Sequence, residues 1–202
     1  MSWDEAGPRM PGWGKGIMTT AALFLSGALL GLVSKHFDST SIIGDITTRP
    51  GIWILLVTLL SAFSRNPRVA AAHTFVFLLG MLLAYYTYST WLFGFFPARV
   101  ATAWGIFALL SPAVGYILRF SRRKGWPAML AGAAPIGFLL SQGYSFYCTH
   151  AVLCAFDLAS AVFLLLVLPS GKPERVGMLS LSLVCFWLML KLNVASRLFG
   201  GL

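Results

Sequence analysis

Residues 143–169 read GYSFYCTHAVLCAFDLASAVFLLLVLP, an apolar stretch with one carboxylate, Asp157, well inside it. At about 20 apolar residues per crossing, this stretch predicts a transmembrane helix. An ionised carboxylate in hydrocarbon costs about 3 kcal/mol or more. Asp157 therefore requires a charged partner, a proton or a hydrated cavity. His150, Cys154 and Asp157 follow one another at helical spacing and are predicted to share one helix face.

The composition indicates the same class for the whole chain. Of its 202 residues, 58% are hydrophobic and 10% are charged, whereas soluble domains carry about 25% charged residues. The sequence therefore predicts an all-α fold, a polytopic transmembrane helix bundle. Residues 1–15 are predicted to form a cytoplasmic tail, and residues 16–202 a single transmembrane helical domain.

Seven spans are predicted, with six as the alternative, at residues 16–34, 51–63, 69–91, 100–118, 126–147, 151–168 and 176–191. The second span has only 13 residues, roughly 20 Å of helix against a hydrocarbon core of about 30 Å. Either the bilayer thins there, or part of residues 41–49 enters the membrane and is buried in protein. In the first span, Gly27 and Gly31 allow a neighbouring helix to approach closely.

The basic residues predict the orientation, because cytoplasmic loops are enriched in Lys and Arg. With a cytoplasmic N-terminus, ten basic residues fall on the cytoplasmic side: Arg9, Lys15, Arg65, Arg68, Arg119, Arg122, Arg123, Lys124, Lys172 and Arg175. Five fall outside: Lys35, Arg49, Arg99, Lys191 and Arg197. The C-terminus is then extracytoplasmic. Because the bases lie in short loops, we expect them to contact anionic lipid rather than nucleic acid.

Two stretches resemble known proteins: residues 44–89, GDITTRPGIWILLVTLLSAFSRNPRVAAAHTFVFLLGMLLAYYTYS, and residues 125–147, GWPAMLAGAAPIGFLLSQGYSFY. Both are similar to a group of small multi-spanning bacterial membrane proteins of unknown function. This resemblance implies a multi-pass protein of the bacterial inner membrane. In size and basic loops the chain also looks like the substrate-binding subunits of vitamin importers. Those subunits have six spans with both ends inside, and the seven-span prediction departs from that pattern.

Polar residues of the predicted spans gather in their outer half, beside the short second span. This placement is typical of transporter sites, and it predicts an outward-facing polar cavity that binds or transports a small solute or ion. The candidate binding residues are Asp157, Lys191, Gln142, His150, Asp45, Arg49 and Tyr144. The alternatives are a non-catalytic membrane partner or assembly subunit and, third, an unrecognised membrane-embedded enzyme.

The charged candidates leave two interpretations open. Asp157 and Lys191 are predicted to pair across the last two spans, either as a structural contact or as part of a proton or cation site. Asp45 and Arg49 precede a helix start at Pro50, where a half-helix N-terminus favours an anion. The alternative for that pair is a solvated surface salt bridge.

The sequence offers little for catalysis. His150, Cys154 and Asp157 have a spacing that suits three metal ligands, but no HExxH or paired-cysteine motif accompanies them, so no metal site is predicted. No nucleophile or phosphate-loop motif is present either, and an enzyme is the less favoured class. No pattern indicates a cofactor. An odd number of cysteines, three, excludes a fully paired disulfide framework.

Overall fold

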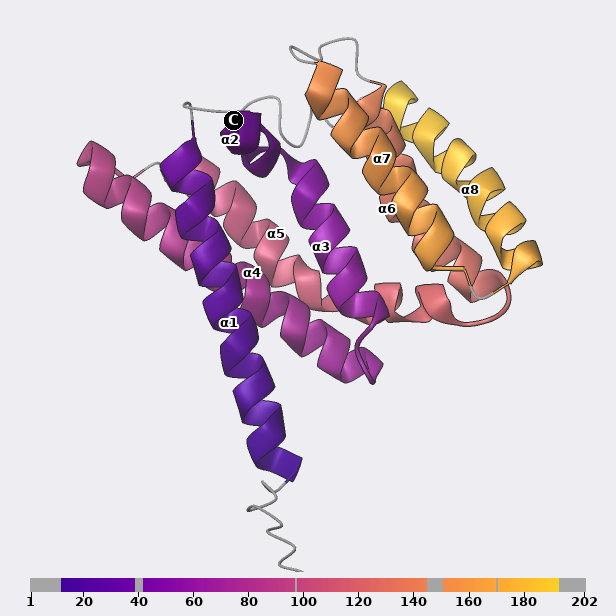
Figure 1. Cartoon of the computed structure of the whole chain (residues 1–202), viewed down its shortest axis with the longest axis horizontal. Helices are drawn as coiled ribbons and strands as arrows, with labels where there is room; N and C mark the ends of the chain where they lie inside the picture. Colours follow the sequence, from indigo (N-terminus) through magenta and orange to yellow (C-terminus); the bar gives the residue numbers. More distant parts are fainter. Residues whose placement is uncertain (1–11, 39–41, 97, 145–150, 170, 193–202) are drawn as a thin grey trace, which may run out of the picture.

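The computed structural model describes residues 12–38, 42–96, 98–144, 151–169 and 171–192, and these ranges contain helices and no strand (Figure 1). The elements are α1 (Gly12–Phe37), α2 (Ile42–Thr48), α3 (Pro50–Ala62), α4 (Pro67–Phe93), α5 (Ala98–Leu118), the 3-10 helix η1 (Arg119–Arg122), α6 (Trp126–Gly143), α7 (Ala151–Val167) and α8 (Lys172–Lys191). The predicted all-α class is confirmed.

Each predicted span coincides with one helix, and α2 is an additional short helix. The fifth predicted span, residues 126–147, extends past α6, which ends at Gly143. Among the described residues, four helical segments are long and apolar enough to cross a membrane: Gly16–Phe37, Pro67–Phe93, Val100–Arg122 and Lys172–Lys191. Helices α3 and α7 are apolar but shorter. These lengths and compositions are those of a membrane protein.

Proline sets the start of four helices. Pro50, Pro67, Pro127 and Pro173 each occupy the first or second position of a helix, where the missing N–H would have no intrahelical partner. Helix α4 ends at Gly94, which has a left-handed φ of 71°, a conformation that glycine adopts without a steric penalty.

Glycine brings α1 and α4 close together. A side chain at Gly27 would collide with the backbone oxygen of Phe77, and one at Gly31 with that of Met81. From the opposite helix, a side chain at Gly80 would collide with the backbone oxygen of α1 residue Phe24. The predicted role of Gly27 and Gly31 in helix approach is confirmed, and their partner helix is α4.

Helix α3 contributes to both hydrophobic cores (Figure 1). The first core joins α3 to α4 and α5 through Trp53, Val57, Phe77, Leu78, Met81, Ala108 and Leu118. The second joins α3 to α6, α7 and α8 through Ala62, Ile136, Leu139, Ala161, Leu164, Leu168 and Met178. Helix α6 packs against both α7 and α8, which touch one another little. The predicted pair of Asp157 and Lys191 requires α7 and α8 to pack side by side, and they do not.

Candidate functional site

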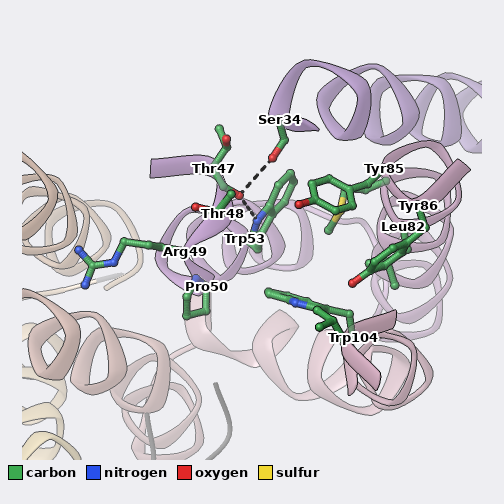
Figure 2. A pocket seen from close by; sticks show the side chains of 12 residues that line it. Ser34, Thr47, Thr48, Arg49, Pro50, Trp53, Leu82, Tyr85, Tyr86 and Trp104 are labelled. Carbon is green, nitrogen blue, oxygen red and sulfur yellow. Dashed lines mark hydrogen bonds between the residues drawn. The ribbon is translucent and has the colours of Figure 1, made fainter. Parts of the chain in front are cut away.

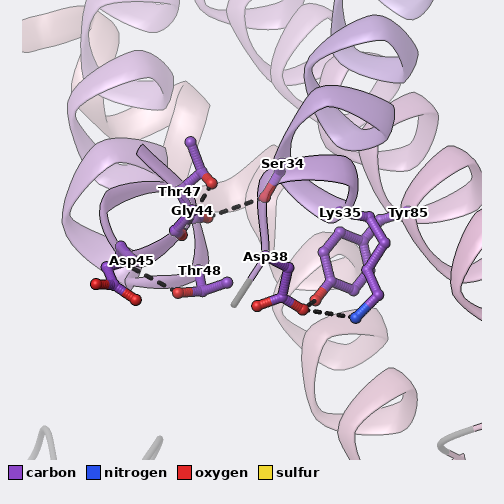
Figure 3. Close-up of polar contacts among 8 residues, drawn as sticks. All are labelled: Ser34, Lys35, Asp38, Gly44, Asp45, Thr47, Thr48 and Tyr85. Atoms are coloured by element: carbon purple, nitrogen blue, oxygen red, sulfur yellow. Dashed lines mark hydrogen bonds and ion pairs between the residues drawn. The ribbon is translucent and has the colours of Figure 1, made fainter. Parts of the chain in front are cut away.

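Residues 42–49 form part of the bundle rather than a free loop (Figure 3). The backbone oxygen of Thr47 accepts hydrogen bonds from Ser34 Oγ at 3.4 Å and from Trp53 Nε1 at 2.8 Å. A side chain at Gly44 would collide with the backbone oxygen of Phe37. The predicted packing of this segment is confirmed for its described part, and its depth in the membrane stays a prediction.

A pocket of about 350 Å³ lies between α1, the junction of α2 and α3, and helices α4 and α5 (Figure 2). Its lining combines four aromatic rings with hydroxyl-bearing side chains and one basic residue. The lining residues are Ser34, Thr47, Thr48, Arg49, Pro50, Trp53, Met81, Leu82, Tyr85, Tyr86, Val100 and Trp104. Such a mixture of apolar surface and few polar groups is usual for small-molecule sites.

Arg49 connects this pocket to α7. It lies between α2 and α3 and forms one edge of the pocket, while its side chain extends away from the aromatic rings (Figure 2). Its Nη2 is 3.7 Å from Oδ2 of Asp157. The Arg49 side chain is 24% exposed and that of Asp157 only 3%. Oδ2 of Asp157 is buried and has no hydrogen-bond partner in the described part of the chain.

Asp157 lies against the first turn of α3. A side chain at Gly51 would collide with Oδ1 of Asp157, so only glycine allows this close approach. The first N–H groups of a helix lack intrahelical partners, and the helix dipole is positive there, which favours a nearby carboxylate. The helix start near Pro50 was predicted to favour an anion, and in the structure the anion beside it is the protein's own Asp157.

The predicted pair of Asp157 and Lys191 is wrong. Lys191 is exposed, and its Nζ lies 5.5 Å from the ring centre of Trp187 on its own helix. Asp157 instead forms its ion pair with Arg49. The reason is the position of α6, which packs between α7 and α8 and keeps their polar residues apart.

Among the described residues, none of the other predicted site residues forms an ion pair with Asp157. Asp45 is half-buried on α2, and no ion pair joins it to Arg49 within the described residues. The salt-bridge alternative for these two residues is therefore not seen. Gln142 is buried on α6. Tyr144 is 69% exposed and packs edge-on against Phe186. His150 lies outside the described residues.

The structure argues against Cys154 as a metal ligand. Cys154 is disulfide-bonded, whereas Cys185 is free. A sulfur engaged in a disulfide is not a thiolate and does not bind a metal as cysteine ligands do. Asp157 therefore lacks the cysteine ligand that its helical spacing had suggested.

A second polar cluster beside the pocket was not predicted from the sequence (Figure 3). The buried Lys35 donates to Oδ2 of Asp38 at 2.5 Å, and the Tyr85 hydroxyl donates to the same oxygen at 3.3 Å. Lys35 Nζ also lies 4.6 Å from the ring centre of Phe93. These contacts hold the end of α1 against α4. The sequence signal was the Lys35–Asp38 spacing of three residues, which places both on one helix face.

No protein-family model, curated protein or solved structure matches the chain. The resemblance of residues 44–89 and 125–147 to bacterial membrane proteins therefore stays a prediction. The structure itself shows helices with four candidate membrane spans in its described residues, and an aromatic pocket beside an ion pair between the partly exposed Arg49 and the buried Asp157.

Proposed function

We propose that this protein binds or transports a small solute or ion, and that the pocket beside Arg49 is its binding site. One observation supports this most directly: Arg49 lines the edge of the pocket, and its guanidinium, turned away from the aromatic rings, lies 3.7 Å from the buried Asp157. The volume of about 350 Å³ lies within the range of about 300–1,000 Å³ typical of ligand pockets.

The break between α2 and α3 supports the same function. Two short helices meet at Arg49, and the N-terminus of α3 faces a buried carboxylate. Transporters place binding sites at discontinuous helices of this kind, since the helix ends supply partial charges within the membrane. A protein that only assembles with partners has no need of a charged residue between a cavity and a buried acid.

We further propose seven crossings of a bacterial inner membrane, with the N-terminus in the cytoplasm and the pocket facing outward. The end of α1, the starts of α3 and α7 and the end of α8 lie at the same end of the bundle (Figure 1). The basic-residue bias places this end outside. The disulfide of Cys154, near the start of α7, supports the same side, because disulfides persist in oxidising compartments. The basic opposite end would contact anionic lipid.

A ligand screen tests the function. The purified protein in detergent is heated with inorganic ions, amino acids, sugars or organic acids, and its tryptophan fluorescence is followed. A ligand of the pocket should raise the unfolding temperature. Its effect should be lost in Trp104→Ala, which removes a pocket wall, and kept in Trp187→Ala, which removes an exposed ring of α8. If no solute stabilises the protein, the partner-subunit alternative is favoured.

A further inference from the structure

Arg49 is the one charged residue among those lining the pocket. Its side chain is 24% exposed, whereas that of Asp157 is 3% exposed and does not line the pocket. Arg49 therefore brings a positive charge to the edge of the pocket, where a rotation of its side chain can turn the guanidinium toward a solute. The negative charge of Asp157 stays buried outside the pocket lining. The charge carried by the pocket lining is therefore positive, and this favours a ligand with an anionic group.

The contact between Arg49 and Asp157 is loose. Their nearest atoms are 3.7 Å apart, compared with about 2.7–2.9 Å in a charge-assisted hydrogen bond. Within the described residues, neither the guanidinium nor Oδ2 of Asp157 has a hydrogen-bond partner. A guanidinium has five N–H donors in a planar fork that suits a carboxylate. Arg49 thus retains its full capacity to bind a second carboxylate.

The walls of the pocket suit a flat ring. Trp53, Tyr85, Tyr86 and Trp104 line it together with few polar groups, and aromatic side chains stack favourably on planar ligands. A volume of about 350 Å³ is near the lower limit for ligand pockets, so the ligand is compact. The shape and the charge together describe a small ring-bearing organic acid.

We propose that the solute is a small aromatic carboxylate and that its carboxylate competes with Asp157 for Arg49. This inference rests on the proposed function and specifies its substrate class. In the empty protein Arg49 pairs with Asp157. When the solute enters, a rotation of the long Arg49 side chain turns the guanidinium into the pocket, and a bidentate pair with the solute replaces the loose internal one.

The exchange leaves Asp157 without its counter-ion, and a buried unpaired carboxylate is costly. Helices α3 and α6, which pack around it, carry no titratable side chain in residues 50–62 and 126–143, and α2 contributes only another acid, Asp45. On its own helix the nearest titratable type is Cys154, which is disulfide-bonded. Arg49 is the one ion-pair partner of Asp157 among the described residues. Once Arg49 turns to the solute, Asp157 takes up a proton from solution, so that one proton accompanies each bound anion.

Calorimetric titration tests this proposal with benzoate, phenylacetate and indole-3-carboxylate, each compared with its neutral amide. For the wild type, at least one acid should bind at least tenfold more tightly than its amide. Titrations in two buffers of different ionisation enthalpy should show proton uptake that approaches one per bound acid. Arg49→Gln should abolish the preference for the acid.

The decisive variant is Asp157→Asn, which removes the competitor. If Asp157 holds Arg49 for about nine-tenths of the time, its removal should raise the affinity for the acid about tenfold. It should also abolish proton uptake and leave amide binding unchanged. Asp45→Asn is the matched control, because this acid on α2 has no ion pair with Arg49, and it should change neither affinity.

The outcomes separate the two proposals. Equal binding of acid and amide would overturn the anion inference and keep the pocket as a binding site. Failure of all these acids would overturn the inference, while another solute in the thermal screen would sustain the proposed function. Weaker acid binding in Asp157→Asn would show that Asp157 supports the site rather than competes for it. Displacement of the acid by short-chain phosphatidylglycerol, and not phosphatidylcholine, would assign the anion site to a lipid headgroup.

Discussion

The Arg49–Asp157 pair predicts an asymmetric pair of single mutants. Arg49→Gln leaves the buried Asp157, 3% exposed, without a counter-ion, and this should cost about 3 kcal/mol. Asp157→Asn leaves Arg49, 24% exposed, which reaches water along its flexible stem, and this should cost only about 1 kcal/mol. The double mutant has no buried unpaired charge, and its free energy of unfolding should also fall by only about 1 kcal/mol.

The expected coupling is therefore about 3 kcal/mol. Coulomb's law gives an interaction energy of about 4–5 kcal/mol for unit charges 3.7 Å apart at an effective dielectric constant of about 20. The expected coupling energy lies below this value. The assay is the free energy of unfolding by dodecyl sulfate in mixed micelles for the wild type, both single mutants and the double mutant. Lys191→Met, alone and with Asp157→Asn, is the control and should show no coupling. Additive costs at Arg49 and Asp157, or coupling at Lys191, would refute the reasoning.

Three further predictions concern packing and topology. Gly51→Ala should lower the free energy of unfolding by about 1–3 kcal/mol in the same assay, because the new methyl group collides with the buried carboxylate of Asp157. Gly105→Ala is the control and should not lower it, because Gly105 has open space around it. Equal effects of the two substitutions would contradict the close approach of Asp157 to Gly51. In a Cys185→Ser background, a bulky water-soluble thiol reagent should label Thr47→Cys more slowly than the exposed Thr48→Cys, and equal rates would argue against the packed helix. A C-terminal reporter active only in the cytoplasm should be silent; activity would contradict the seven-span topology.

The positions of the helices could be predicted from the sequence because an apolar run of sufficient length indicates a helix without any knowledge of its neighbours. Pro50 also marked a helix start correctly, whereas α4 begins at Pro67, two residues before the predicted third span. The extra helix α2 was anticipated only as a packed segment, because the short span after it required one.

The partner of Asp157 could not be predicted in this way. Membrane helices are apolar on lipid-facing and core-facing sides alike, so the pattern does not show which side faces which neighbour. Chain order suggested Lys191, which follows in the next helix. The structure instead brings in Arg49, more than one hundred residues earlier in the chain, because α3 packs between the two halves of the bundle. Trp53 and Trp104 became pocket walls for the same reason.

The shared position of α3 has a mechanical consequence. Apart from the η1 turn, α5 and α6 touch little, so α3 is the main element that contacts both α4–α5 and α6–α7. If one half of the bundle tilts against the other, α3 acts as the pivot, and Arg49 and Gly51 lie at its N-terminal end. A movement of α7 relative to α3 would change the separation of Arg49 and Asp157, which join these two helices. The strength of the ion pair between Arg49 and Asp157 would therefore depend on the angle between the two halves of the bundle.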